Sequence, residues 1–99
     1  MTTRIEHAIQ LYEEASLAEE QGNIDRAEVL YLESRDMFLK EGGSHLIDAT
    51  NIMNAVAFMK EKYGDYEGAL HAGENSIQIL ERVGTITSRE AQEVRLQAW

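Results

Sequence analysis

Proline is missing from this sequence, and its absence favours long helices over other structures. Among the 99 residues there are also no cysteines and only seven glycines. Proline interrupts a helix because it lacks the backbone donor and its ring clashes with the preceding turn. Runs of β-branched residues, which favour strands, are few as well. The composition therefore predicts an all-α fold, and the lack of cysteine excludes disulfides and thiol chemistry.

Basic residues are also scarce, with nine Lys and Arg against eighteen Asp and Glu, for a formal net charge of −9. A field of that sign repels nucleic acid and anionic membranes, so neither is an expected partner. No apolar run approaches the roughly 20 residues needed to span a bilayer, and the first residues carry no hydrophobic signal region. We therefore expect one domain over residues 1–99, soluble and cytoplasmic.

One stretch of the chain has an echo 42 residues later. Both stretches have the same order of residue types: Gly, a polar residue, an apolar residue, an acid, one further residue and then Ala. The two stretches are Gly22-Asn23-Ile24-Asp25-Arg26-Ala27-Glu28 and Gly64-Asp65-Tyr66-Glu67-Gly68-Ala69-Leu70. The offset also relates Ala15 to Ala57, Glu19 to Glu61, Ser34 to Ser76, and Gly42 to Gly84. A fixed period of this length, built from helix-turn-helix units, is typical of a helical repeat array.

Capping signals divide the sequence into five expected helices. Thr3 and Glu6 form a capping box, Gly22 ends the first helix, and Ser44 is expected to cap the third. Two helix pairs follow, one over about residues 4–42 and one over about 45–84. Gly84 is expected to end the fourth helix, with a C-terminal helix over about 88–99. Because that helix still runs at Trp99, we expect a fragment of a longer protein.

Both units resemble tetratricopeptide repeats over about residues 5–84. The family pattern has a small residue in the first helix, a Gly in the turn and an Ala early in the second helix. These are Ala15, Gly22 and Ala27 in the first unit, and Ala57, Gly64 and Ala69 in the second. The repeat of about 34 residues is lengthened here to 42, as in repeats of the kinesin light chain type. Met53-Asn54-Ala55-Val56-Ala57 matches the Leu-Asn-x-Leu-Ala element of that type, whereas Tyr12 replaces the Asn in the first unit. The resemblance implies a right-handed superhelix of two pairs with a C-terminal capping helix.

A concave groove lined by the first helix of each pair is a further implication of the resemblance. The side chains placed there would be Ile9, Tyr12, Ser16, Glu19, Asn51, Asn54, Phe58, Glu61 and Lys62. Asn side chains can pair with a peptide backbone of any sequence, and aromatic residues often anchor interfaces. The acids favour a segment carrying Lys or Arg. We expect a protein-protein interaction module that binds a peptide or partner helix in this groove.

Catalysis and metal binding are not expected. The three histidines fall on different elements, and no converging set of catalytic groups can be assembled. Glu67, His71 and Glu74 share a helical face, but such spacing is common by chance on a surface, so we expect no metal and no cofactor. The alternative function is self-association into a homodimer, in which one exposed end of the repeat is buried against a second copy. The residues at the two ends are Ile5, Ile9 and Tyr12, or Leu96 and Trp99.

Overall fold

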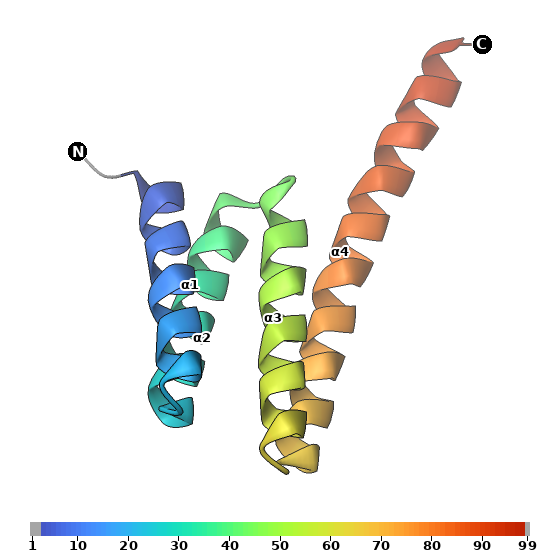
Figure 1. The fold of residues 1–99 in the computed structure, drawn as a ribbon. Helices are drawn as coiled ribbons and strands as arrows, with labels where there is room; N and C mark the ends of the chain where they lie inside the picture. Colours follow the sequence, from blue (N-terminus) through green and yellow to red (C-terminus); the bar gives the residue numbers. More distant parts are fainter. Residues whose placement is uncertain (1–2, 99) are drawn as a thin grey trace.

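The computed structural model describes the backbone of residues 3–98 and the side chains of residues 3–84. Within that span the chain forms four helices and no strand: α1 (Arg4–Glu20), α2 (Ile24–Glu41), α3 (His45–Lys62) and α4 (Tyr66–Ala98). Three-residue turns join them, and each helix packs against the next. The result is two antiparallel hairpins, α1–α2 and α3–α4, lying side by side (Figure 1). The fold is all-α, as the composition predicts.

Both hairpin turns are built in the same way. Gly22, at φ +80°, donates its N–H to the Glu19 carbonyl at 2.9 Å, while the Asn23 N–H reaches the Ala18 carbonyl at 2.9 Å. These two bonds define a Schellman motif, which needs a left-handed residue. The same bonds recur 42 positions later, from Gly64 to Glu61 and from Asp65 to Lys60, at 3.1 and 2.8 Å. The prediction that these two glycines end helices is confirmed.

The residue after each turn glycine also begins the next helix. The Asn23 side chain accepts from the Arg26 N–H at 3.3 Å, and the Asp65 side chain accepts from the Gly68 N–H at 2.9 Å. Such side-chain acceptors satisfy amides that the first helical turn leaves unpaired. A Cβ added at Gly68 would overlap the Asp65 carboxylate, so the second cap is the tighter one.

Within each hairpin a buried serine joins the two helices. Ser34 is fully buried, and its hydroxyl donates to the Ala8 carbonyl at 2.6 Å. Ser76 donates to the Thr50 carbonyl at 3.4 Å, again 42 positions later at both ends of the bond. Small side chains make this close approach possible, since Ala8, Ala15 and Ala27 are all fully buried. Around them the core is completed by Leu11, Leu30, Phe38, Leu46, Ile52, Met53, Val56, Met59 and Ile79.

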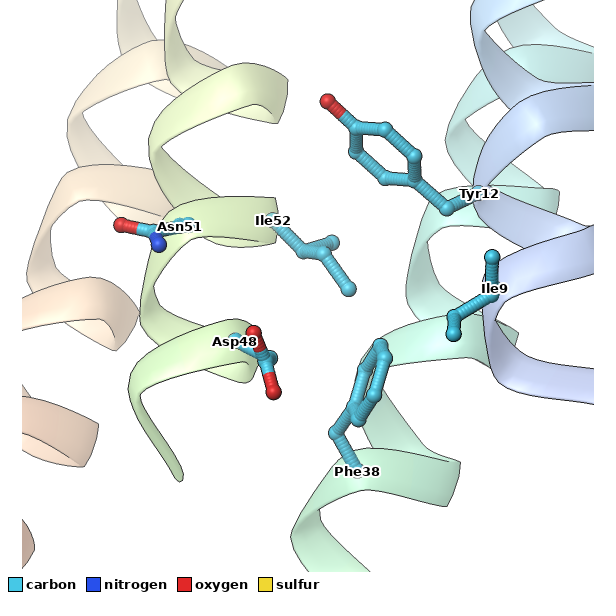
Figure 2. Close-up of a pocket in the computed structure, with 6 residues that line it drawn as sticks. All are labelled: Ile9, Tyr12, Phe38, Asp48, Asn51 and Ile52. Atoms are coloured by element: carbon cyan, nitrogen blue, oxygen red, sulfur yellow. The ribbon is translucent and has the colours of Figure 1, made fainter. Parts of the chain in front are cut away.

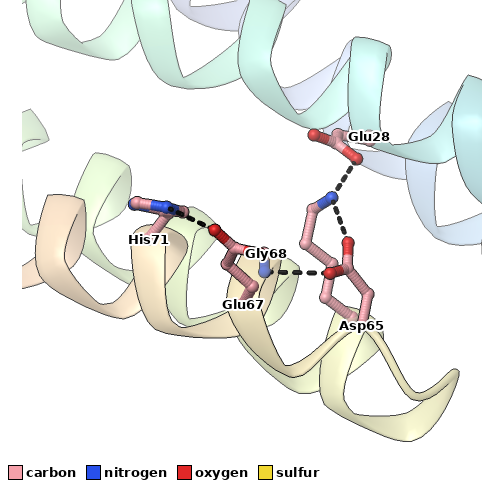
Figure 3. A network of polar contacts seen from close by, with 6 residues as sticks. Glu28, Asp65, Glu67, Gly68 and His71 are labelled. Carbon is pink, nitrogen blue, oxygen red and sulfur yellow. Dashed lines mark hydrogen bonds and ion pairs between the residues drawn. The ribbon is translucent and has the colours of Figure 1, made fainter.

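A three-residue ion network joins the two hairpins. Lys60 on α3 lies 2.6 Å from Glu28 on α2 and 3.2 Å from Asp65 in the second turn (Figure 3). The hydrogen bond to Glu28 raises the pKa of Lys60. The Gly68 amide, and then Lys60, lower the pKa of the Asp65 carboxyl. The network therefore connects the turn of the second hairpin to the first.

Two expectations about helix ends are wrong. α4 runs through Gly84 and the expected capping box to Ala98, so the separate C-terminal helix over 88–99 does not form. Gly84 is not in the left-handed conformation, and a helical glycine costs only about 1 kcal/mol relative to alanine, which the helix tolerates. Ser44 precedes α3 with helical backbone angles and makes no capping bond with its side chain. Trp99 lies outside the described residues.

Close packing inside the first hairpin is tested by enlarging an alanine. We expect Ala15→Leu to destabilise the protein by about 1–3 kcal/mol, because added methylenes have no space between α1 and α2. Ala57→Leu is the matched control, since Ala57 holds the equivalent position in the second hairpin but is only partly buried. Denaturant unfolding monitored by circular dichroism measures both. Equal losses in the two variants would contradict the packing described.

Asp65→Asn removes the ion pair with Lys60 but keeps a capping side chain, because Asn23 shows that asparagine can cap the equivalent turn of the first hairpin. Since the folded-state pKa of Asp65 is lowered, its stabilising effect is complete above the ordinary carboxyl pKa of about 4 and is lost as the pH falls through the folded value. We expect the wild type to have the higher melting temperature at neutral pH and the difference to close in acid. Glu13→Gln, at an exposed site on α1, is the control. A difference independent of pH would contradict the assignment.

Candidate functional site

A groove lies between the first helices of the two hairpins. Ile9 and Tyr12 face it from α1, and Asp48, Asn51 and Ile52 face it from α3. Phe38 of α2 forms its floor, because α2 lies behind both helices, and Figure 2 shows these six side chains around the space. Its volume is about 260 Å³. The groove is open to solvent and is lined largely by apolar groups.

Exposure differs between the walls and the floor. Ile9 and Tyr12 are 46% and 40% exposed, which is high for large apolar side chains, whereas Ile52 and Phe38 are buried. The Tyr12 ring is held edge-on against Tyr31, with ring centroids 5.7 Å apart. The α1 wall therefore offers exposed apolar surface on a rigid helical support.

The polar edge of the groove belongs to α3. Asp48 Oδ2 lies 3.0 Å from His45 Nδ1, and the His45 ring stacks on Phe38 with centroids 5.7 Å apart. Asn51, one turn further along α3, is exposed and carries both donors and an acceptor. A ligand in the groove would thus meet apolar groups from α1 and a carboxylate and an amide from α3.

The structure brings three of the nine predicted groove residues together around this space: Ile9, Tyr12 and Asn51. Four others are exposed on α3 beyond Asn51, towards the end of the helix: Asn54, Phe58, Glu61 and Lys62. Phe58 is 73% exposed, the largest value among the exposed large hydrophobic residues. Asn54 is partly committed to the fold, since its Oδ1 accepts from the Ser76 hydroxyl at 2.7 Å. These four side chains do not line the groove, and Phe58 lies about two turns of α3 beyond Asn51.

The remaining two predicted residues, Ser16 and Glu19, bind Tyr31 of α2. The Tyr31 hydroxyl donates to Glu19 Oε1 at 3.0 Å and lies 3.3 Å from Ser16 Oγ. Burial, with the Glu19 carboxylate adding to it, raises the pKa of Tyr31 to about 12. Ser16 and Glu19 therefore contribute to the first hairpin rather than to the groove lining.

Sequence reasoning did not place Phe38, Asp48 and Ile52 at the groove. Phe38 and Ile52 belong to the apolar stripes of their helices, a pattern that indicates packing, and both are part of the core. The signal available was geometric: a groove between two first helices needs a floor from the helix behind them. Phe38 is the last large residue of the α2 stripe and stands opposite the start of α3.

Other parts of the described surface carry less chemistry. A second hollow between α2, α3 and α4 contains Arg35 and Lys60, but Asp36 lies 2.9 Å from Arg35, and Glu28 and Asp65 neutralise Lys60. His71 lies 3.9 Å from Glu67 and 3.7 Å from Glu74. Among residues 3–84, no three His, Cys, Asp or Glu side chains are grouped to hold a metal ion. No helix in the described range has the length and apolarity to cross a membrane.

Comparisons with protein-family models, with curated proteins and with solved structures gave no match to this chain.

The burial of Tyr31 can be tested by alkaline titration. Because its folded pKa is raised from about 10 to about 12, its contribution to stability is complete below pH 10 and is lost as the pH rises between these values. We expect the absorbance difference between wild type and Tyr31→Phe to show one tyrosinate that ionises near pH 12. Ionisation of that group near pH 10 in the folded protein would contradict the geometry around Ser16 and Glu19.

Proposed function

We propose that this protein is a non-catalytic protein-protein interaction module that binds a peptide segment in the groove between α1 and α3. The observation that carries the proposal is the pair of exposed apolar side chains, Ile9 and Tyr12, facing a groove with a buried aromatic floor at Phe38. Large apolar groups that remain exposed around a concave site are typical of ligand surfaces. Tyrosine is also enriched among residues that dominate binding energy.

Two anchor points give the proposed ligand a spacing. The groove at Asn51 and the exposed ring of Phe58 are separated by seven residues of α3, or about 10 Å at 1.5 Å per residue. An extended peptide covers that distance in about three residues at about 3.3 Å each. The ligand would therefore place one apolar side chain in the groove and a second about three positions away, against Phe58. Asn51 would pair with the backbone between them.

Charge selects the ligand further. The chain carries a net charge of −9, and Asp48 stands at the edge of the groove with Glu61 further along α3. Complementary charge speeds association and excludes acidic competitors. A peptide with Lys or Arg beside its apolar anchors suits this surface best.

The repeat in the chain supports this proposal through the fold class. Turns, caps and buried serine bonds recur at the same 42-residue offset, as expected of two tetratricopeptide-like units in a right-handed superhelix. In arrays of that class the first helix of each unit lines the concave surface, and α1 and α3 would hold those places in this chain. A cytoplasmic adaptor that presents this surface to other proteins is the corresponding role.

A displayed library of random peptides tests the proposal without knowledge of the natural partner. We expect enrichment of peptides with two apolar residues about three positions apart and an accompanying Lys or Arg. For an enriched synthetic peptide, Tyr12→Ala should weaken binding by about 30-fold, the effect of a hot spot of about 2 kcal/mol. Asn51→Ala should weaken it by roughly threefold to tenfold through the lost hydrogen bond. Isothermal titration calorimetry measures both.

Val29→Ala is the matched control, because Val29 is 55% exposed on α2 and does not line the groove. Its affinity should equal that of the wild type, and circular dichroism should be the same for all variants. Asn54 is a poorer probe, since removing its amide also breaks the bond to Ser76. Selection of no common motif, or equal affinities in all three variants, would place the binding surface elsewhere.

A further inference from the structure

The two hairpins have the same helix register but differ at one position of their second helices. The buried serines show the register, because the hydroxyls of Ser34 and Ser76 bond to carbonyls that are also 42 positions apart. At the position where α2 has Tyr31, α4 has Gly73. Since the register is equal, Gly73 faces the part of α3 that corresponds to the part of α1 facing Tyr31.

In the first hairpin a tyrosine ring fills this position. Tyr31 is 3% exposed, and its ring stands edge-on against Tyr12. Its hydroxyl donates to Glu19 Oε1 at 3.0 Å and lies 3.3 Å from Ser16 Oγ. Ser16 and Glu19 are both partly buried. The ring therefore covers one side of α1, and α1 supplies a carboxylate acceptor for its hydroxyl.

In the second hairpin the same position is open. A Cβ added at Gly73 would find no atom of α3 within 4 Å. The equivalents of Ser16 and Glu19 are Phe58 and Glu61, and both are exposed. Among residues 3–84, the Glu61 carboxylate has no hydrogen-bond or ion-pair partner. The acceptor of the first hairpin is thus repeated in the second, but the ring that would use it is not.

Large apolar side chains border Gly73 on α4. Leu70, Ile77 and Leu80 lie three, four and seven positions from it on the same side of the helix, and all are more than half exposed. Apolar side chains grouped in this way on one surface mark a contact site. We name the space beside Gly73, bordered by Ile77 of α4 and by Phe58 and Glu61 of α3, the Gly73 site.

The Gly73 site is continuous with the groove between α1 and α3. Asn51 lines the groove, Asn54 follows one turn later, and Phe58 follows one turn after that. A ligand that leaves the groove along α3 therefore reaches the Gly73 site within about 10 Å.

We propose that the Gly73 site binds a tyrosine side chain of the peptide ligand, with the phenol ring over Gly73 and the hydroxyl donating to Glu61. The inference rests on the proposed function, and it identifies the second apolar anchor beside Phe58 as a tyrosine. The ligand tyrosine packs against α3 as Tyr31 packs against α1.

The chemistry of the site selects tyrosine over other side chains. Leucine or phenylalanine would cover the apolar border but would offer no donor to Glu61. Lysine or arginine would pair with Glu61 but would not fill the space over Gly73 with a ring. Tyrosine combines an apolar ring with a hydroxyl donor at its far end, and Tyr31 already shows this combination with Glu19.

Gly73→Tyr tests the site without a ligand. The backbone of Gly73 is not left-handed and a Cβ has room there, so the substitution causes no strain. The introduced tyrosine should reproduce the arrangement of Tyr31, whose pKa burial raises to about 12. We expect alkaline absorbance titration to show that it ionises at a higher pH than the tyrosine of Gln78→Tyr, an exposed position of α4 away from the site. Equal ionisation in the two variants would overturn the inference.

The displayed peptide library, selected against the wild type and against Gly73→Tyr, tests the ligand. On the wild type we expect tyrosine at the second anchor position. On Gly73→Tyr that preference should be lost, because the introduced ring occupies the site, while the apolar anchor of the groove remains. In an enriched synthetic peptide, phenylalanine in place of this tyrosine should weaken binding by about tenfold through the lost bond to a carboxylate.

Glu61→Gln identifies the acceptor through a double-mutant cycle measured by calorimetry. It should weaken binding of the tyrosine peptide more than binding of the phenylalanine peptide, because only the tyrosine donates to Glu61. Glu20→Gln is the matched control, since Glu20 is an exposed glutamate of α1 and the charge change is the same. It should affect both peptides equally.

The outcomes separate this inference from the proposed function. Two apolar anchors without a preference for tyrosine, or Lys or Arg at the second position, would overturn the Gly73 site and leave the groove as the binding surface. Independent effects of Glu61→Gln and of the phenylalanine replacement would do the same. Selection of no common motif would overturn both.

Discussion

The fold depends on the close approach of the two helices within each hairpin. Alanines at the contact bring the backbones near enough for the Ser34 hydroxyl to reach the Ala8 carbonyl at 2.6 Å. The Ala8 carbonyl lies within α1 and accepts this bond in addition to the hydrogen bonding of its own helix. Without the bond, the Ser34 hydroxyl would be buried without a partner, which costs about 1–3 kcal/mol. The equivalent bond of Ser76 is longer, at 3.4 Å, and Ser76 is shared with Asn54. The serine bond between the two helices is therefore shorter in the first hairpin than in the second.

The hairpin geometry positions the candidate binding surface. Because α1 and α3 both lie against α2, their outer faces converge above Phe38 and leave a groove that neither helix could form alone. The ion network also joins the two hairpins, because Lys60 of α3 pairs with Glu28 of α2 and with Asp65 in the turn between α3 and α4. Packing around α2 thus holds the exposed apolar side chains of α1 on a rigid support, so the protein itself would lose little conformational entropy if a ligand bound there.

Sequence reasoning predicted the local structure well, because local structure has local signals. Gly22 and Gly64 stand where a left-handed residue is required, and the small residues at Ala8 and Ala15 mark the contact face of α1. It failed at Gly84, where the same residue type lies inside α4 without a left-handed conformation, because a glycine inside a helix costs only about 1 kcal/mol relative to alanine.

The groove was predicted only in part for a related reason. Ile9, Tyr12 and Asn51 follow from placing two first helices side by side, and the structure brings those three together. In the sequence, Phe38 and Ile52 look like core residues because they lie on the apolar stripes of their helices, and both are buried in the structure. Only the three-dimensional arrangement shows that they also line the groove. The pairing of Ser16 and Glu19 with Tyr31 depends on side-chain geometry that spacing does not contain.

The shared capping residue in each turn has a consequence for how the protein can vary. Asn23 and Asp65 each cap the end of one helix through the backbone N–H and cap the start of the next through the side chain. In each turn a single residue separates the last helical residue from the glycine. Such a turn has no position at which a residue could be inserted without breaking a bond on one side. Fraying of either helix also removes the cap of its neighbour, so the two helices of a hairpin open as a single cooperative unit. Sequence variation that preserves this fold is therefore expected on helix faces rather than as insertions in the two hairpin turns, whereas the turn between α2 and α3, where the Ser44 side chain makes no capping bond, lies outside this constraint.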